Sequence, residues 1–331
     1  MTASPQTATA ETAATVPQAR IARLPAALFG AVLGLAGLGL AWRSAASVFG
    51  APAFISEAIV ALGAAAFILL AACYVAKIVR APAAVLAELM HPGQSSFFGT
   101  ITISFALMAA AALPWSRPLA EILWAVGAAL QATLIVAVFR NWIAHPMQVD
   151  HIHPGWFILM VGIVVGVPPG VALGHRELSW ACFALGTLSA VMLYPLVLFR
   201  LFFHAPLPPA LRPTLFILIA PPALIFSAYF ALDGGALDAF AHGLFFAGLF
   251  FTVLVLSLPR LFLGLPFAVS WWAYTFPLDA MTVAALSYHA RTGTAASAVL
   301  SGSLLVLTTG IVAIVFARTL VAVRNGTLLA G

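Results

Sequence analysis

The chain has 331 residues, of which 63% are hydrophobic and only 7% are charged. Soluble domains carry roughly 25% charged residues, so this composition excludes an ordinary soluble protein and predicts an all-α polytopic membrane protein. Each membrane span needs about 20 apolar residues, which leaves no room for a folded enzyme domain beside about ten spans. The net charge of +5 does not indicate nucleic-acid binding, because basic residues in a membrane protein mark one side of the bilayer.

Ten apolar segments follow one another with short connections. They cover Leu24–Trp42, Phe54–Ala76, Phe97–Leu113, Leu119–Phe139, Trp156–Leu173, Leu178–Phe199, Thr214–Leu232, Ala239–Leu258, Phe267–Tyr288 and Ala295–Ala317. We therefore expect a ten-helix transmembrane domain over residues 23–318. Residues 1–22 are rich in alanine, threonine and proline and predict a disordered N-terminal tail, and residues 319–331 predict a short C-terminal tail.

The basic residues predict the orientation of these spans. The side that holds the N-terminus carries Arg20, Arg23, Lys77, Arg80, Arg140, Arg200, Arg212, Arg260, Arg318 and Arg324, whereas the other side carries only Arg43, Arg117, Arg176 and Arg291. By the positive-inside rule, both tails are expected in the cytoplasm. An even number of spans independently agrees with that orientation.

Helix-breaking residues gather in the odd-numbered segments. Examples are Pro25 and Gly30 in the first, Pro168 and Pro169 in the fifth, Pro221 and Pro222 in the seventh, and Pro277 in the ninth. The third segment lacks an internal proline and offers Thr100, Thr102 and Ser104 instead. The simplest arrangement is five helical hairpins, each with one irregular and one regular helix. Irregular helices belong inside, because their freed backbone groups need protein or water as partners.

The ninth segment contains the stretch from Trp271 to Met281, which combines a phenylalanine, a proline and an acid: Phe276, Pro277 and Asp279. Asp279 is the only acid well inside a span, and a membrane carboxylate is expensive unless it serves function or is hydrogen-bonded. Both alternatives stay open for Asp279. Helical geometry places Phe276 and Asp279 about 60° apart on one broad face.

Other motifs favour structural roles. The series Gly30, Gly34, Gly37 and Gly39 has small-residue spacing, which favours close helix packing over substrate contact. His151 and His153 beside Asp150 could hold a metal, but a solvated turn is favoured because no further ligand cluster is evident. No phosphate loop, nucleophile elbow or zinc signature is present, so we expect no enzyme activity and no cofactor.

The charges within the spans bear on the transported species. No lysine or arginine lies in the middle of any expected span. Tight binding of a dianion would call for compensating cations or several aligned helix N-termini there. A low-affinity anion path needs less, because broken helices supply N–H dipoles and weak binding permits exit. The charge distribution therefore favours such a path.

Several motifs resemble the family of the tellurite-resistance protein TehA and the plant slow anion channels, also called the C4-dicarboxylate transporter and malic acid transport family. They are the segments 29–38, 96–101, 153–157 and 220–223 and, as the most specific part, 271–281. The likeness extends from about Arg23 to Arg324. It implies ten helices in five hairpins around a quasi-five-fold central pore, in a homotrimer with one pore per subunit.

The resemblance also implies roles for individual residues. Phe276 matches a phenylalanine that plugs the pore, and Gly30 matches a pore-lining glycine. With the kink and pore candidates Thr102, Pro168, Pro222, Pro277 and Asp279, they form the expected site. The expected function is an anion channel of the bacterial inner membrane for chloride or nitrate. A proton-linked transporter of malate, another C4-dicarboxylate or a tellurite-related substrate, with Asp279 carrying the proton, is the alternative.

Overall fold

The computed structural model describes residues 21–328, and these residues form helices and connecting turns without a β-strand. Five helical runs are irregular and we call them inner helices 1 to 5. They comprise η1 (Ala26–Phe29) with α2 (Gly30–Phe49); η2 (Ser95–Phe97) with α5 (Phe98–Ala112); α7 (Trp156–Val161), η4 (Gly162–Gly166) and α8 (Val167–Leu173); η5 (Pro209–Ile219) with α10 (Ala220–Leu232); and η7 (Val269–Tyr274) with α12 (Thr275–Thr292).

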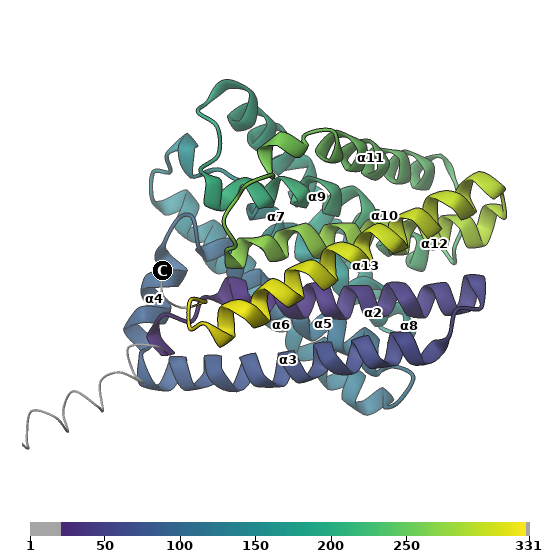
Figure 1. Cartoon of the computed structure of the whole chain (residues 1–331), viewed down its shortest axis with the longest axis horizontal. Coiled ribbons are helices and arrows are strands. Elements are labelled where there is room, and N and C mark those ends of the chain that lie inside the picture. Colours follow the sequence, from purple (N-terminus) through teal and green to yellow (C-terminus); the bar gives the residue numbers. More distant parts are fainter. Residues whose placement is uncertain (1–20, 329–331) are drawn as a thin grey trace, which may run out of the picture.

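Each inner helix is followed by one regular outer helix. The outer helices are α3 (Ala53–Arg80), α6 (Arg117–Ala144), α9 (Arg176–Phe203), α11 (Ala239–Leu256) and α13 (Ala295–Arg324). Figure 1 shows α2 and α12 side by side across the middle of the molecule, with α3 beneath them and α13 crossing in front. The remaining elements, α4 (Pro82–Met90), η3 (Val149–His151) and η6 (Pro259–Leu261), are short connections. The chain is thus the all-helical polytopic membrane protein that its composition predicts.

Burial separates the two sets of helices. In the first four inner helices, at least 67% of the most apolar 18-residue stretch is buried, against at most 33% in any outer helix. In α12 nearly every residue from Thr275 to Leu286 is buried. The outer helices expose large apolar side chains such as Ile68, Phe202 and Val306. Such exposure is stable in lipid, so the outer helices form the lipid-facing shell.

Within residues 21–328, nine helical runs are long and apolar enough to span a membrane. The ninth expected segment, Phe267–Tyr288, is also helical, as η7 and α12, but α12 is the least apolar of the long helices and carries Asp279, His289 and Arg291. A helix enclosed by other helices does not need a lipid-compatible surface. The count of ten spans therefore stays a prediction. The last helix, α13, continues to Arg324, past the boundary expected at residue 318.

Every inner helix contains a 3-10 segment, and proline explains where three of them give way to α-helix. Pro168 and Pro169 lie in the first turn of α8, Pro221 and Pro222 in that of α10, and Pro277 in that of α12. Proline is tolerated there because the first-turn N–H groups have no intrahelical acceptor. Prolines at these positions therefore mark the restart of a helix rather than a kink in its middle.

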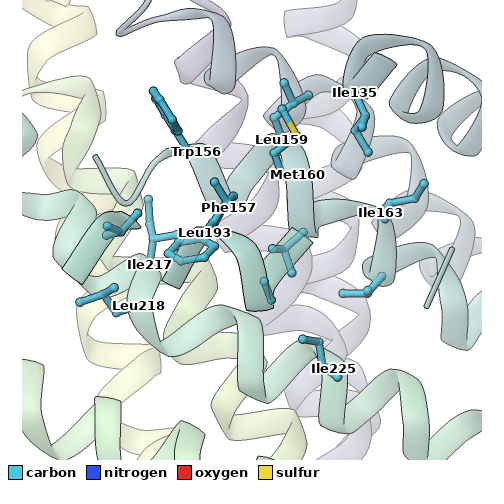
Figure 2. Close-up of a cluster of buried hydrophobic side chains, with 14 of the residues drawn as sticks. Ile135, Trp156, Phe157, Leu159, Met160, Ile163, Leu193, Ile217, Leu218 and Ile225 are labelled. Carbon is cyan, nitrogen blue, oxygen red and sulfur yellow. The ribbon is translucent and has the colours of Figure 1, made fainter. Parts of the chain in front are cut away.

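The largest apolar cluster fills the space between inner helices 3 and 4 and their outer partners. Figure 2 shows side chains from α7, α9 and η5 meeting there, among them Phe157, Leu193 and Ile217. Each of these side chains is at least 96% buried. Burying such a side chain contributes about 1.5–3 kcal/mol, so this cluster holds the irregular segments in place.

Glycines set the approach of α2 to inner helix 5. A Cβ on Gly30 would lie 2.9 Å from the Cβ of Trp272, one on Gly34 would collide with Thr275, and one on Gly37 would lie 2.7 Å from Oδ2 of Asp279. These three glycines therefore pack against inner helix 5, whereas Gly39 packs against Val60 of the outer helix α3. Small residues allow two backbones to approach this closely.

Candidate functional site

The candidate site is a cavity lined by residues of all five inner helices, and the volume in it that is open to water-sized molecules is about 50 Å³. Its walls include Gly30 from α2, Thr100 from α5, Gly162 from η4, Pro221 from α10 and Phe276 from α12. Most of the lining residues come from the N-terminal halves of their inner helices, and Pro221 and Leu224 lie just past the middle of inner helix 4, so the cavity lies nearer the end of the bundle where the inner helices begin. We call it the central cavity.

One apolar residue from each inner helix meets beside the central cavity. Leu33, Ile103, Val165, Leu224 and Phe276 belong to a single cluster of packed apolar side chains. Leu224 is partly buried and the other four are buried. Four of the five also line the central cavity, Val165 being the exception. We call these residues the apolar ring; each contributes only hydrocarbon to the packing beside the central cavity.

Phe276 reaches the central cavity because of how inner helix 5 is built. The segment before it, η7, is a 3-10 helix that ends at Tyr274, and α12 begins at Thr275. Phe276 and Pro277 therefore lie in the first turn of α12, and both line the central cavity. The Phe276 side chain is 9% exposed and packs in the same cluster as Leu33 and Ile103.

The expected site residues do not all gather there. Gly30, Phe276 and Pro277 line the central cavity, whereas Thr102, Pro168, Pro222 and Asp279 do not. Pro168 and Pro222 each lie in the first turn of an α-helix, and Pro221 rather than Pro222 faces the cavity. The prolines thus shape inner helices 3 and 4 without all contributing to the cavity wall.

Thr102 belongs to a hydrogen-bonded network behind the cavity wall. Its hydroxyl donates to Oε1 of Gln131, and Nε2 of Gln131 donates to the backbone oxygen of Leu159. Gln131 lies on the outer helix α6 and is 3% exposed. Leu159 lies near the end of α7, where the chain changes to the 3-10 segment η4 and some carbonyls lose their helical partners.

The same arrangement recurs elsewhere on α6 and on a second outer helix, α9. Trp124 on α6 donates its Nε1–H to the oxygen of Gly166 at 2.8 Å, and Tyr194 on α9 donates its hydroxyl to the oxygen of Leu218 at 2.6 Å. Both acceptors lie in 3-10 segments of inner helices. Sequence reasoning missed these residues; a polar side chain within an otherwise lipid-facing helix was the available signal.

Asp279 is 1% exposed, and neither of its carboxyl oxygens has a hydrogen-bond partner within the described part of the chain. Its side chain packs against Gly37 of α2 instead of lining the central cavity. Phe276 and Asp279, expected to share one face, therefore have different neighbours. Their 60° separation is enough to direct one toward the axis and the other toward α2.

His153 differs from the solvated turn that its sequence context favoured. It is 1% exposed, its ring stacks on Phe97 at 5.8 Å, and its Nδ1 accepts the N–H of Gly155 at 3.1 Å. Among residues 21–328, no group of three or more His, Cys, Asp or Glu side chains is placed to hold a metal ion. His153 thus contributes to the packing between the starts of inner helices 2 and 3.

Together the fold and the cavity define a membrane protein whose irregular inner helices surround a central cavity. A model of the SLAC1 family, described as voltage-dependent anion channel, matches residues 23–320. The chain therefore belongs to the SLAC1 family, whose members are anion channels and transporters.

Relatives of two kinds are similar to the chain. It is 28% identical over 270 residues to a tellurite resistance protein TehA homolog of Haemophilus influenzae, covering 80% of this chain and 81% of that protein. It is 26% identical over 277 residues to the S-type anion channel SLAH3 of Arabidopsis thaliana, covering 80% of this chain and 43% of that protein. The guard cell S-type anion channel SLAC1 of the same plant is 23% identical over 312 residues, or 90% of this chain and 55% of that protein. The chain thus spans about half the length of these plant channels.

Proposed function

We propose that the protein is a channel for small monovalent anions such as chloride and nitrate, with one pore per subunit along the axis of the inner helices. The observation that carries this proposal is the central cavity, to which all five inner helices contribute. Family membership supports anion transport, because S-type anion channels are among the relatives. Phe276 is the proposed gate, and Gly30 and Pro277 are proposed pore-lining residues.

The apolar ring supports the proposal that Phe276 is the gate. A narrow hydrocarbon constriction obstructs an ion by excluding the water that the ion carries. Phe276 contributes the largest side chain of the apolar ring and stands at the start of α12, where a small backbone rotation would move its phenyl ring. Displacing this one side chain would therefore widen the constriction more than displacing any other member.

The polar groups of the central cavity fit weak anion binding. Among residues 21–328, no charged side chain lines the cavity, and the hydroxyl-bearing lining residues are Thr100 and Ser270, of which Thr100 already donates to the backbone oxygens of Ala26 and Phe97. The Ser270 hydroxyl is buried without a partner in the described part of the chain. A hydroxyl donor without a cation offers a passing chloride a contact that it can leave easily.

The proposal also includes the number of spans, the orientation in the membrane and the oligomeric state. We propose ten spans in quasi-five-fold symmetry, both termini in the cytoplasm, and a homotrimer in a bacterial inner membrane. The excess of lysine and arginine on the side of the N-terminus supports this orientation. In this orientation the central cavity lies nearer the cytoplasmic side of the membrane. The proposed partners are small inorganic anions and the lipid bilayer.

Electrophysiology on Phe276→Ala in a reconstituted bilayer tests the gate. We expect chloride conductance to rise at least about tenfold, because an alanine leaves the constriction open. Phe226→Ala is the matched control, since Phe226 is fully buried in α10 and does not line the central cavity. Unchanged conductance in a folded Phe276→Ala protein would refute the gating role.

One observation favours a second function. The unpartnered carboxyl of Asp279, buried between α12 and α2, has the position of a proton carrier in a coupled transporter of malate, another C4-dicarboxylate or a tellurite-related substrate. Proteoliposomes loaded with a pH gradient distinguish the two functions. Saturable malate uptake that depends on the gradient and disappears in Asp279→Asn would favour the transporter, whereas unsaturated chloride current would favour the channel.

A further inference from the structure

The end of the inner bundle opposite the central cavity carries four arginines with one shared feature: each donates hydrogen bonds to backbone oxygens at the C-terminal end of an inner helix or in the turn that follows it. Arg43 bonds to Ala110 and Ala111, Arg117 to Ala172 and Leu173, Arg176 to Leu232, and Arg291 to Gly234 and Gly235. We call these four residues the arginine collar. They are the same four that the sequence places on the side away from the N-terminus.

The arginine collar follows the order of the inner helices. Arg43 lies near the end of inner helix 1 and bonds to the end of inner helix 2. Arg117 follows inner helix 2 and bonds to inner helix 3, and Arg176 follows inner helix 3 and bonds to inner helix 4. Arg291, in the last turn of α12, bonds to the turn after inner helix 4. One arginine therefore bridges each successive pair of inner helices.

The bridges repeat along the chain. Arg117 and Leu173 are 56 residues apart, and so are Arg176 and Leu232. The remaining junction, between inner helices 5 and 1, has no arginine among residues 21–328; there Phe49 packs on the ring of His289 at 5.2 Å. Four of the five junctions between neighbouring inner helices are thus bridged by an arginine that bonds to a backbone oxygen. This repetition agrees with the five hairpins expected from the sequence.

The charges at this end of the inner bundle decide how the arginine collar affects an approaching anion. The C-terminal end of a helix carries about half a negative charge, so five inner helices ending together would repel an approaching anion. A guanidinium carries a full positive charge, so one bonded to the last carbonyls outweighs the half charge of that helix end. Within residues 21–328, only Arg43 of the four has a carboxylate within 4 Å, that of Glu57 at 3.0 Å. Arg117, Arg176 and Arg291 are exposed and keep their charge free of an ion pair.

Acidic residues lie at the same end but mostly have other partners. Glu57 pairs with Arg43, Glu121 with His175, and Asp238 accepts from the N–H of Ala241 and the hydroxyl of Tyr229. Glu177 is exposed beside Arg176, and Asp233 follows the end of α10. Arg176 and Glu177 place opposite charges on neighbouring residues. Neutralising each in turn therefore tests whether the sign of the charge at this position affects anions.

We propose that the arginine collar is the anion-entry site of the pore, where a small inorganic anion is attracted by guanidinium groups that also hold the inner helices together. This inference rests on the proposed channel function. Exposed charges at a pore mouth raise the local concentration of the opposite ion, and salt screens the effect. The arginine collar should therefore govern conductance when chloride is dilute and lose its influence when chloride is concentrated.

The test uses the full-length protein with Phe276→Ala in planar bilayers and measures chloride conductance. At about 0.05 M chloride, Arg117→Gln and Arg176→Gln should each lower conductance about two- to fivefold, and at about 1 M the difference should vanish because the screening length falls to about 3 Å. Arg176→Lys should keep most of the conductance, since it keeps the charge, and Glu177→Gln should raise it.

The outcomes separate this inference from the channel itself. If Phe276→Ala conducts chloride and the glutamine variants match it at low salt, the arginine collar has no role in entry. The same conclusion holds if Arg176→Lys loses as much conductance as Arg176→Gln, because the arginine would then act only through its hydrogen bonds. If Phe276→Ala conducts no chloride, both the proposed channel and the entry site fail. Melting temperatures of the purified variants verify that each is folded.

Discussion

Gly37 and Asp279 are in direct contact, although 242 residues separate them: a Cβ on Gly37 would lie 2.7 Å from Oδ2, 2.9 Å from Cβ and 3.0 Å from Cγ of Asp279. The two residues belong to α2 and α12, which lie side by side (Figure 1). The glycine is therefore needed because the acid opposite it leaves no space for a side chain. Within the described part of the chain, the Asp279 carboxyl thus packs against the backbone of α2 and has neither a cation nor a hydrogen-bond donor as its partner.

Gly37→Ala should destabilise the protein by about 1–3 kcal/mol, because the added methyl group overpacks the contact with Asp279. Thermal unfolding of the purified protein in detergent measures the effect. Gly302→Ala on α13 is the matched control, since a Cβ there meets nothing within 4 Å. If contact with Asp279 is the cause, Gly37→Ala should cost less in an Asp279→Gly background. Equal costs in both backgrounds would contradict this explanation.

The start of inner helix 1 depends on a buried ion pair. Nζ of Lys77 lies 2.5 Å from Oε2 of Glu88, whose other oxygen accepts the N–H of Ala26 at 2.6 Å. Glu88 also accepts from the hydroxyl of Tyr74, and Lys77 donates to the oxygen of Leu24. This network fixes the segment that leads into the wall of the central cavity.

Removing one member of the pair should be costly. Lys77→Met should destabilise the protein by about 3–5 kcal/mol, because it leaves the Glu88 carboxylate buried without its cation. Lys77→Met with Glu88→Gln should recover part of that loss, since the glutamine oxygen can still accept from Ala26 and carries no charge. Thermal unfolding measures both variants. A double variant less stable than Lys77→Met would argue against the burial of charge as the cause.

Stability should also depend on pH through His153. Burial lowers the pKa of His153 to about 4, and the charge of Arg200 adds to the lowering while the backbone of Gly93 opposes it. Between pH 6.5, the ordinary pKa of histidine, and pH 4, His153 binds a proton in the unfolded chain but not in the folded protein. Stability is thus complete above pH 6.5 and falls as the pH drops toward 4, by about 3 kcal/mol in total.

Unfolding measured between pH 7 and pH 4 checks this dependence. His153→Gln should be less stable than the parent at pH 7 and should lose less stability on acidification, because glutamine does not titrate. His145→Gln serves as the control, since His145 is exposed. An equally steep pH profile for parent and His153→Gln would exclude His153 as the source.

The network of Thr102, Gln131 and Leu159 predicts a further effect on stability. Gln131→Leu should cost about 1–3 kcal/mol, because the Leu159 oxygen and the Thr102 hydroxyl each lose a buried partner. Gln131→Glu would test the geometry, since a glutamate keeps an acceptor for Thr102 but loses the donor to Leu159. Thr133→Val, on the exposed side of the same helix, should change the melting temperature little. A cost of Gln131→Leu no larger than that of Thr133→Val would contradict the role of the network.

The sequence by itself determined the class of protein and much of its internal pattern. Low charge and long apolar segments require a lipid environment, and prolines repeated near Pro168, Pro221 and Pro277 indicated irregular helices that only the interior can accommodate. The run from Trp271 to Met281 pointed to the family and to Phe276. These features are local, so they can be recognised from neighbouring residues alone.

Only the tertiary structure decided which residues meet. That Phe276 faces the central cavity while Asp279 faces Gly37, that Tyr194 bonds to a carbonyl of η5, and that Arg176 bonds to Leu232 all depend on contacts between helices. In the 3-10 segment η5, the backbone oxygen of Leu218 likewise finds its partner on another helix, α9. Propensity and periodicity describe one helix at a time, whereas packing in a bundle selects rotation and depth for all of them together.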